Sequence, residues 1–540
     1  MSEPRDEAPA AERAAITYSY QGPSMAEAVQ ELRAKKDQYR AMGGPERIER
    51  QHSQGKLTVR ERLELLFDPG TFFEYGLLAH HQSQSPAMQG KFTPADGVVT
   101  GIGEIDGRKV CVVAYDFTVM AGSIGMVTEL KAARMRELAL RERIPIVWLI
   151  DSAGARIQEA TGSMFARTGD LFREQVIMSG VVPQVAAMMG PGAAGTAYIP
   201  GLADFVPMVK GTSNMALAGP HLVKAAVGED VSAEDMGGSA VHTKISGVAD
   251  LEVESDEECI VAVRTYLGFF PSSNLGSPPL AETADPVTRR AEELYDIVPA
   301  NPRQAYDVHR VIAAIVDDGR FFELKPTWAR NLVTGFARFG GRPVGIVANQ
   351  PKFLGGALDV NAADKAARFV WLCDAFNIPL VFLMDCPGFL VGSTVEKQGI
   401  IRHGAKMLFA VAEATVPKVT VVMRKGYGAG YYVMNGRAYE PDLIVAWPTA
   451  EISVMGPEGA VNIIFRKQIE GLPEEQRDQA RNDMVAMIRE QISPYIAAGW
   501  SFIDDIIDPA DTRASICAGL GAAANRRVER PWRKHGVLPV

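Results

Sequence analysis

Short, uninterrupted apolar runs bounded by glycine and proline set the hydrophobic pattern of this chain. Residues 182–189 and 416–423 each lead into a glycine-rich turn, and residues 144–150 and 378–384 each lead into an aspartate followed by a small-residue turn. Continuous apolar runs of this length are typical of strands that are covered on both faces. Apolar residues also recur at helical spacing over residues 366–376, which predicts a helix with one buried face. The pattern predicts an α/β fold.

This pattern occurs twice at a constant separation. The first glycine turn, residues 190–195, is matched by the second glycine turn, residues 426–430, since the numbers of Gly192 and Gly426 differ by 234 (426 − 192 = 234). Further pairs with this separation are Val99 and Val333, Gly122 and Gly356, Lys131 and Lys365, Asp151 and Asp385, and Tyr198 and Tyr432. One register held over about a hundred residues indicates an internal duplication.

The duplication divides the chain into two halves. We expect an N-terminal half over residues 25–275 and a C-terminal half over residues 285–540, with the proline- and serine-rich passage 268–286 as the linker. Residues 1–24 are acidic and alanine-rich, which predicts disorder. The charged segment 25–62 is predicted to be helical.

Composition and charge narrow the functional classes. The net charge is −9 and basic residues do not cluster with aromatic ones, which argues against nucleic acid as a partner. No run approaches the ~18 apolar residues that a membrane span requires, and no presequence is evident at the N-terminus. The five cysteines form no CxxC pair, which favours a reducing compartment. We expect a cytoplasmic protein, away from membranes, and interpret His80-His81 as part of a solvated loop, with no metal site.

The glycine turns admit three interpretations. The first turn matches the G-x-G-x-x-G fingerprint of dinucleotide binding, but Met215-Ala216-Leu217 occupies the place of the expected ribose-binding acid. In the second interpretation, the small residues have no catalytic role and only allow a helix to pack closely on a strand. Two turns at the same place in two copies favour the third interpretation, in which adjacent backbone N–H groups stabilise a developing oxyanion.

Residues 151–159, Asp-Ser-Ala-Gly-Ala-Arg-Ile-Gln-Glu, resemble the DSGGARIQE motif of the carboxyltransferase subunits of biotin-dependent acyl-CoA carboxylases. Residues 218–220, 228–231, 236–238 and 446–456 are similar to further motifs of that family, in the same order. The resemblance runs from about residue 25 to the C-terminus. It implies a ClpP/crotonase-like ββα-spiral domain in each half, and an active site between the N-terminal half of one subunit and the C-terminal half of another. It also implies a homo-hexamer that works with a biotin carboxylase and biotin carboxyl carrier subunit.

The resemblance also implies residue roles. Ala194 and Gly195 would form the oxyanion hole for the acyl-CoA thioester oxygen, and Ala429 and Gly430 the hole for the biotin ureido oxygen, although alanine and glycine are rearranged relative to the family. We expect the substrate pockets to include Gly122, Tyr198, Gly356 and Tyr432. Biotin would act as its own base on the acyl-CoA, so Asp151, Asp385 and Glu159 are predicted to be structural. The sequence contains no Met-Lys-Met biotinylation site and no ATP-grasp half, so we expect biotin to be carried by another polypeptide.

The predicted function is transfer of a carboxyl group from carboxybiotin to a short-chain acyl-CoA such as propionyl-CoA, through a thioester enolate. The sequence does not decide between acyl-CoA substrates. Tyr432 replaces an aspartate of propionyl-type members, whereas residues 436–439 are closer to methylcrotonyl-type members. Acetyl-CoA is a further alternative. The same chemistry could run in reverse in a biotin-dependent decarboxylase. A biotin-independent crotonase-type hydratase or isomerase and a noncatalytic scaffold are the alternatives from other classes.

Overall fold

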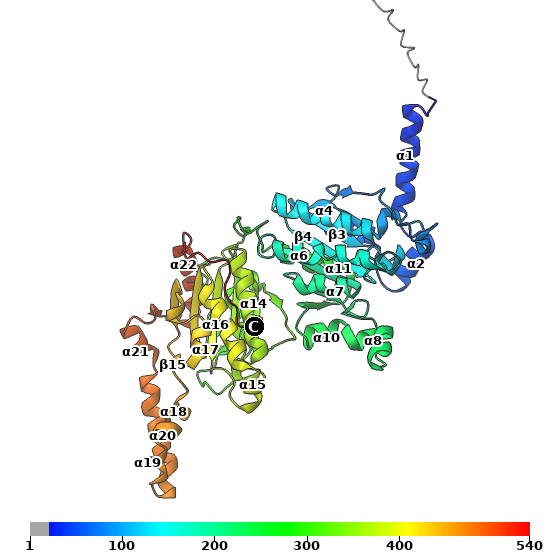
Figure 1. The fold of residues 1–540 in the computed structure, drawn as a ribbon. Coiled ribbons are helices and arrows are strands. Elements are labelled where there is room, and N and C mark those ends of the chain that lie inside the picture. The colour runs from blue at the N-terminus through cyan, green and yellow to red at the C-terminus, as the bar shows by residue number, and fades with distance from the viewer. Residues whose placement is uncertain (1–20) are drawn as a thin grey trace, which may run out of the picture.

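The computed structural model describes residues 21–540, so the predicted disordered tail lies almost entirely outside the described residues. The segment predicted to be helical forms α1 (Met25–Arg40), α2 (Pro45–Ser53) and α3 (Val59–Leu66). The chain then builds two halves, each around one eight-stranded sheet (Figure 1).

The sheet of the first half has the order β1-β2-β3-β4-β5-β6-β8, with β7 paired to β5. Strands β1, β2 and β3 pair antiparallel, and the strands from β3 onward are parallel. Its strands are β1 (Phe73–Tyr75), β2 (Val98–Ile105), β3 (Arg108–Tyr115), β4 (Ile146–Ser152), β5 (Gln184–Ala193), β6 (Pro207–Val209), β7 (Asn214–Ala216) and β8 (Leu251–Val253). Its main helices are α4 (Met126–Glu142), α6 (Asp170–Met178), α7 (Gly195–Leu202), α8 (Pro220–Val227), α10 (Ser239–Lys244) and α11 (Asp256–Leu267).

The sheet of the second half repeats this arrangement in the order β9-β10-β11-β12-β13-β14-β16, with β15 paired to β13. Its strands are β9 (Phe322–Leu324), β10 (Leu332–Phe339), β11 (Arg342–Asn349), β12 (Leu380–Cys386), β13 (Lys418–Tyr427), β14 (Leu443–Ala446), β15 (Glu451–Ser453) and β16 (Asp505–Ile506). Its main helices are α13 (Val308–Ile315), α14 (Val360–Ala375), α16 (Ile400–Glu413), α17 (Gly428–Val433), α18 (Pro457–Ile464), α19 (Arg466–Glu470), α20 (Glu474–Gln491), α21 (Pro494–Gly499) and α22 (Thr512–Ala522).

Strand register confirms the duplication position by position. Ile146 of β4 pairs with Gln184 of β5, and Leu380 of β12 pairs with Lys418 of β13. Both members of the second pair follow those of the first at the same offset of 234 (380 − 146 and 418 − 184). The predicted helix over residues 366–376 corresponds to α14, and the four predicted strands correspond to β4, β5, β12 and β13.

Two details differ from the sequence prediction, and both recur in the second half, where β13 continues to Tyr427 and Asp385 lies inside β12. β5 continues through Ala193, well past the predicted end at Met189, because its last three residues pair with β7. Asp151 lies inside β4 rather than in the turn after it. In both cases the strand extends beyond the apolar run.

Each half has its own core, and a third core joins them. One cluster of buried residues lies wholly within residues 98–249 and a second wholly within residues 291–520. The third includes residues of both halves, among them an aromatic group in which Tyr266 lies edge-on to Phe336 with centroids 6.0 Å apart. An ion pair between Lys325 and Asp250, at 2.9 Å, also crosses the boundary.

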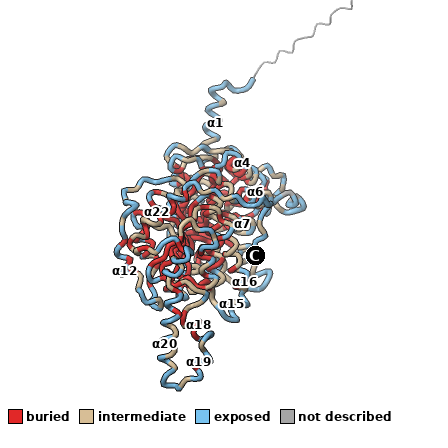
Figure 2. The backbone as a smooth tube through the Cα atoms, turned by 90° about the vertical axis from the view of Figure 1, so that its left-hand side faces the viewer, coloured by how far each residue is buried: buried red, intermediate tan, exposed pale blue. Residues whose placement is uncertain are grey.

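Two helical segments project from the buried core. Figure 2 shows α1 and the α18–α20 region as extensions at opposite ends of the red, buried interior. We call residues 457–491, which contain α18, α19 and α20, the helical hairpin. Over residues 21–540, no helix has the length and apolar character needed to span a bilayer.

Candidate functional site

Both glycine turns contain a residue with positive φ where a central strand passes into a helix. Ala194 (φ 54°, ψ −117°) separates β5 from α7, and Gly428 (φ 56°) follows β13 as the first residue of α17. A non-glycine residue in such a conformation costs roughly 1–3 kcal/mol, and strain of this kind clusters at functional sites. The first N–H groups of a helix have no partner within that helix, so each turn places backbone donors beside a strand end.

The four predicted oxyanion residues differ in how they are packed. The Ala194 N–H donates to the Ala216 carbonyl at 3.0 Å, which ties the turn to β7. A Cβ built on Gly195 would find its nearest neighbour outside the turn at Phe172 Cζ, 3.6 Å away. Ala429 is exposed, whereas a Cβ on Gly430 would lie 2.5 Å from the Cys386 Sγ. Ala194 is exposed although its N–H is bonded, and Gly195 is half-buried with room beside it for a ligand. In the second turn Ala429 is open to a ligand and Gly430 is packed into the fold.

The duplication adds one residue that the sequence analysis did not single out. A separation of 234 pairs Ala194 with Gly428 and Gly195 with Ala429 (194 + 234 = 428; 195 + 234 = 429). The matching φ angles of Ala194 and Gly428 support this pairing. The signal was present in the sequence, because Gly192 and Gly426 already define the register.

A second pair of loops supports the glycine turns. The Gly154 carbonyl accepts from the Ile124 N–H at 2.8 Å, and the Gly388 carbonyl accepts from the Leu358 N–H at 3.0 Å. Gly154 and Gly388 are related by the same offset (388 − 154 = 234), and both have positive φ, 90° and 118°. A Cβ on Gly154 would lie 2.6 Å from the carbonyl oxygen of Ala193. The loop after β4 therefore contacts the end of β5 directly.

The predicted pocket glycines, Gly122 and Gly356, are part of this support. Gly122 (φ 60°) and Gly356 (φ 81°) are buried, and a Cβ on them would lie 2.2 Å from the carbonyl oxygen of Asp151 and 2.8 Å from that of Asp385. Only glycine combines this backbone with this close approach. Their position indicates a role in packing the loops beneath the turns.

The two aspartates that end the apolar strands are buried ion-pair partners. Asp151 is 0% exposed and lies 2.7 Å from Lys56 Nζ and 3.0 Å from Arg62 Nη1. Asp385 is likewise 0% exposed and lies 2.8 Å from Arg424 Nη2. Carboxylates enclosed in this way hold the surrounding segments together and do not face solvent. These contacts support the predicted structural role.

Glu159 also has structural contacts. Its carboxylate accepts from the Met126 N–H at 3.1 Å, at the start of α4, and pairs with Arg156 Nη1 at 2.8 Å. Arg156 is itself buried against Asp96 at 2.7 Å. Glu159 therefore orders the loop that contains the motif 151–159.

The duplicated lysines anchor each half in the same way. Lys131 Nζ donates to the Ala95 carbonyl at 2.7 Å, and Lys365 Nζ donates to the Leu332 carbonyl at 2.7 Å. Burial lowers the pKa of Lys131 to about 8 and that of Lys365 to about 7. Both amines contact main-chain carbonyls, so we assign them to the scaffold.

Exposed apolar side chains lie at equivalent places in the two halves. Tyr198 is 50% exposed and its counterpart Tyr432 is 49% exposed. Ile157 and Val391, which share the offset (391 − 157 = 234), are exposed as well. Tyr198 lies edge-on to Phe172, and Tyr432 stacks on Tyr439. Each turn is thus followed by a helix with a half-exposed tyrosine, which we call the rim of that turn.

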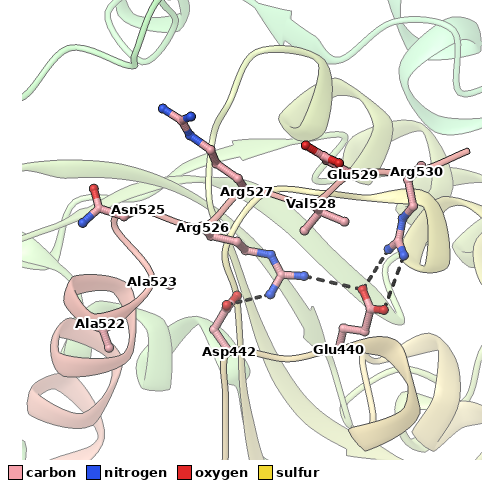
Figure 3. A pocket seen from close by; sticks show the side chains of 10 residues that line it. All are labelled: Glu440, Asp442, Ala522, Ala523, Asn525, Arg526, Arg527, Val528, Glu529 and Arg530. Atoms are coloured by element: carbon pink, nitrogen blue, oxygen red, sulfur yellow. Dashed lines mark hydrogen bonds and ion pairs between the residues drawn. The ribbon is translucent and has the colours of Figure 1, made fainter. Parts of the chain in front are cut away.

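A large cavity near the C-terminus does not include the turns. Its volume is about 650 Å³, and several of the side chains that line it meet in ion pairs (Figure 3). Arg526 pairs with Asp442 at 2.6 Å and Arg530 with Glu440 at 2.8 Å. Because these charges are already compensated, the cavity is not assigned as the functional site.

Comparison with known proteins shows which proteins this chain is similar to. The carboxyl transferase domain family matches residues 50–538. The methylmalonyl-CoA decarboxylase subunit alpha of Veillonella parvula is 46% identical, and the match covers 95% of this chain and 99% of that protein. The propionyl-CoA carboxylase carboxyltransferase subunit of Haloferax mediterranei is 44% identical, with 96% and 100% covered.

Solved structures give the same result. The crystal structure of the transcarboxylase 12S hexamer, with methylmalonyl-coenzyme A and methylmalonic acid bound, matches with a TM-score of 0.92 at 46% identity. The match covers 97% of this chain and 100% of that one. The predicted fold class, two tandem crotonase-like α/β domains, is confirmed.

Proposed function

Because the chain belongs to the carboxyl transferase family, we propose that it is the carboxyltransferase subunit of a biotin-dependent acyl-CoA carboxylase. It transfers a carboxyl group from carboxybiotin to the α carbon of a short-chain acyl-CoA such as propionyl-CoA. The observation that carries this proposal is the presence of two equivalent glycine turns, with φ of 54° at Ala194 and 56° at Gly428. Two such backbone sites suit a reaction between two carbonyl compounds, with one site for each.

The residues of the turns fit these two reactants. The open surface at Gly195 allows a thioester oxygen to approach its N–H, and the exposed Ala429 allows the same for a ureido oxygen. When bound, biotin supplies the transferable carboxyl group and the base that accepts the α-proton of the acyl-CoA. The N–H groups of this chain stabilise the negative charge that develops on the two oxygens, and losing one such donor typically costs about 2.7–4 kcal/mol. We keep Gly430 beside Ala429 as a donor of the second turn, and Ala194, whose own N–H is bonded to Ala216, as the residue that holds the Gly195 donor in place.

We propose that the complete site forms between two copies, with the first turn of one facing the second turn of the other, in a homo-hexamer. The two turns lie in different halves of one chain, α7 in the cyan-to-green half and α17 in the yellow half (Figure 1). The equivalent apolar residues Ile157 and Val391, which follow β4 and β12, are exposed in a single copy. Large exposed apolar side chains around a polar site favour a covering partner. A biotin carboxylase and carrier subunit is the partner that supplies carboxybiotin.

We retain the domain boundaries 25–275 and 285–540. They are supported by the separate cores of the two halves and by the irregular backbone that follows α11. The cytoplasmic location is supported by the five cysteines, all of which are free thiols in the structure.

The direct test uses the purified chain with methylmalonyl-CoA and free biotin. We expect propionyl-CoA to form at a rate that depends on biotin concentration. A panel of acyl-CoAs offered with the biotin-carrying partner, ATP and bicarbonate then identifies the substrate. Hydration of crotonyl-CoA, with no biotin-dependent carboxyl transfer, would refute the proposal and favour a hydratase.

A second candidate function is carboxyl removal in a biotin-dependent decarboxylase. It is favoured by the 46% identity to the Veillonella parvula subunit. The two functions differ in partner and energy source: a biotin carboxylase and ATP for the first, a sodium-pumping membrane subunit for the second. The identity of the neighbouring genes and the ATP requirement of the native complex separate them.

A further inference from the structure

The two glycine turns differ in the residue that precedes the helix and in the side chains that pack against it. Tyr427 is the last residue of β13, immediately before Gly428, and its counterpart in the first half is Ala193 (427 − 234 = 193). Tyr427 is only 6% exposed, yet its ring packs outside the main cores. It belongs to a separate cluster whose other buried members come from the helical hairpin and the residue just after it, namely Ala460, Val461, Ile469, Ile488 and Ile492.

The Tyr427 hydroxyl also has a polar connection to the hairpin. It donates to the carboxylate of Glu451, the first residue of β15. The other oxygen of Glu451 accepts from Arg489 Nε, in α20, at 2.8 Å. Arg489 also reaches Glu458 at 3.4 Å. Glu451 is buried, and hydrogen bonds to a buried carboxylate are among the stronger ones in proteins.

Close steric contacts place this network against the second turn. A Cβ on Gly428 would lie 3.0 Å from the carbonyl oxygen of Val454, and a Cβ on Gly456 would lie 3.2 Å from the Tyr427 ring. The backbone is tied as well, because the Ile452 N–H donates to the Ile492 carbonyl at 2.9 Å. Residues 451–456, which lead into the hairpin, therefore pack against Tyr427 and Gly428 of the second turn.

Among the residues that the structure describes, the first half shows no such network at this place. Asn214 of β7 pairs with Pro191 of β5, and Glu451 of β15 pairs with Lys425 of β13. Because Pro191 and Lys425 share the offset (425 − 191 = 234), Asn214 is the counterpart of Glu451. Ala193, the counterpart of Tyr427, has no hydroxyl that could donate a hydrogen bond to Asn214.

The helices that follow also differ between the halves. The eight residues of α8 correspond to the eight of α18, with glycine N-caps and proline at the start of both. After α8 the chain forms the short α9 (Ala233–Gly237), whereas after α18 it forms the rest of the hairpin. The hairpin and its contacts with the turn therefore belong to the second half alone among the described residues.

We propose that Tyr427, Glu451 and Arg489 are positioning residues that couple the second glycine turn to the helical hairpin. They fix the direction of the Ala429 and Gly430 N–H groups and leave the first turn unaffected. The proposal rests on the proposed function, in which the second turn is the biotin side. We therefore expect loss of the Tyr427 hydroxyl to impair the reaction with biotin and to leave the binding of the acyl-CoA unchanged.

The test is Tyr427→Phe, which keeps the ring in its cluster and leaves Glu451 paired with Arg489. With methylmalonyl-CoA and free biotin, we expect kcat/KM for biotin to fall about ten-fold or more, the effect of one lost hydrogen bond to a charged group. The KM for methylmalonyl-CoA should stay unchanged. The double variant Tyr427→Phe/Glu451→Met should lose little beyond Glu451→Met alone, because Glu451→Met already removes the acceptor of the Tyr427 hydroxyl.

The matched control is Tyr266→Phe. Tyr266 is also a buried tyrosine, and its hydroxyl has no hydrogen-bond partner among the described residues. We expect its kinetic constants for both reactants to match those of the wild type. A KM for methylmalonyl-CoA that changes as much as kcat/KM for biotin in Tyr427→Phe, or no loss at all, would overturn the proposal.

A readout independent of turnover is amide hydrogen exchange. In Tyr427→Phe, exchange should rise in a peptide covering residues 428–433 and stay unchanged in one covering residues 195–202. Unchanged exchange at both peptides would refute the coupling. If the wild type shows no biotin-dependent carboxyl transfer, the proposed function fails, but the exchange comparison still decides the coupling.

Discussion

Substitution of Gly195 by valine separates catalysis from folding. Gly195 begins α7 with ordinary helical backbone, since it is not among the residues with positive φ. A Cβ there meets Phe172 Cζ at 3.6 Å, which is normal van der Waals contact. Because valine and glycine differ by only a few tenths of a kcal/mol in helix propensity, we expect Gly195→Val to change the free energy of unfolding by less than about 0.5 kcal/mol.

The effect on turnover should be much larger. The added methyl groups occupy the open space beside the Gly195 N–H, where the thioester oxygen is placed by our proposal. Loss of that donor costs about 2.7–4 kcal/mol, which is 10²–10³-fold in kcat. The reason is steric exclusion at the donor, so the KM for biotin should change little.

The assay measures biotin-dependent formation of propionyl-CoA from methylmalonyl-CoA, with thermal unfolding and size-exclusion chromatography as checks on fold and assembly. Gly201→Val is the matched control, because Gly201 lies in the same helix and a Cβ on it would meet nothing within 4 Å. We expect the control to retain full activity. Near-normal turnover of Gly195→Val would refute the assignment of Gly195 as a donor.

Three further predictions follow from single residues. Tyr432→Asp should change the ratio of kcat/KM values among acetyl-, propionyl- and methylcrotonyl-CoA, because Tyr432 is 49% exposed on the rim of the second turn; an unchanged profile would show that it is not the selector. Ala194→Gly should raise the free energy of unfolding by roughly 1 kcal/mol in urea titrations by relieving the positive φ; no gain would argue against strain there. The hydrogen bond to Glu323 raises the pKa of His309, so the stability advantage of the wild type over His309→Gln should be full below pH ~6.5 and disappear as the pH rises through the raised value. Urea titrations from acidic to alkaline pH measure it, and an advantage that grows with pH would contradict this sign.

The duplication could be predicted because it leaves identities at one fixed separation. Glycines are informative here, since Gly122 and Gly356 occupy backbone that other residues rarely adopt, and both copies keep them. The same reasoning located the two turns. Alanine at 194 gave no such signal, because nothing in its type announces a positive φ.

Features that depend on contacts between residues far apart in the chain could not be predicted from the sequence. β5 extends to Ala193 because β7 supplies a partner there, and no local pattern records that partner. The contact between Tyr266 and Phe336 joins the two halves from positions that are far apart in the sequence. The burial of Asp151 likewise requires Lys56 and Arg62, which come from the N-terminal helical segment. Such contacts are set by tertiary packing rather than by periodicity.

The central claim is that main-chain amides of the two glycine turns bind opposite reactants where two copies meet. A structure of the assembled protein with an acyl-CoA and a biotin analogue tests it most directly. We predict the thioester oxygen within hydrogen-bond distance of the Gly195 N–H of one copy, and the ureido oxygen beside Ala429 and Gly430 of another. Both ligands bound within one half of a single copy, or turns that face away from any junction between copies, would contradict the account.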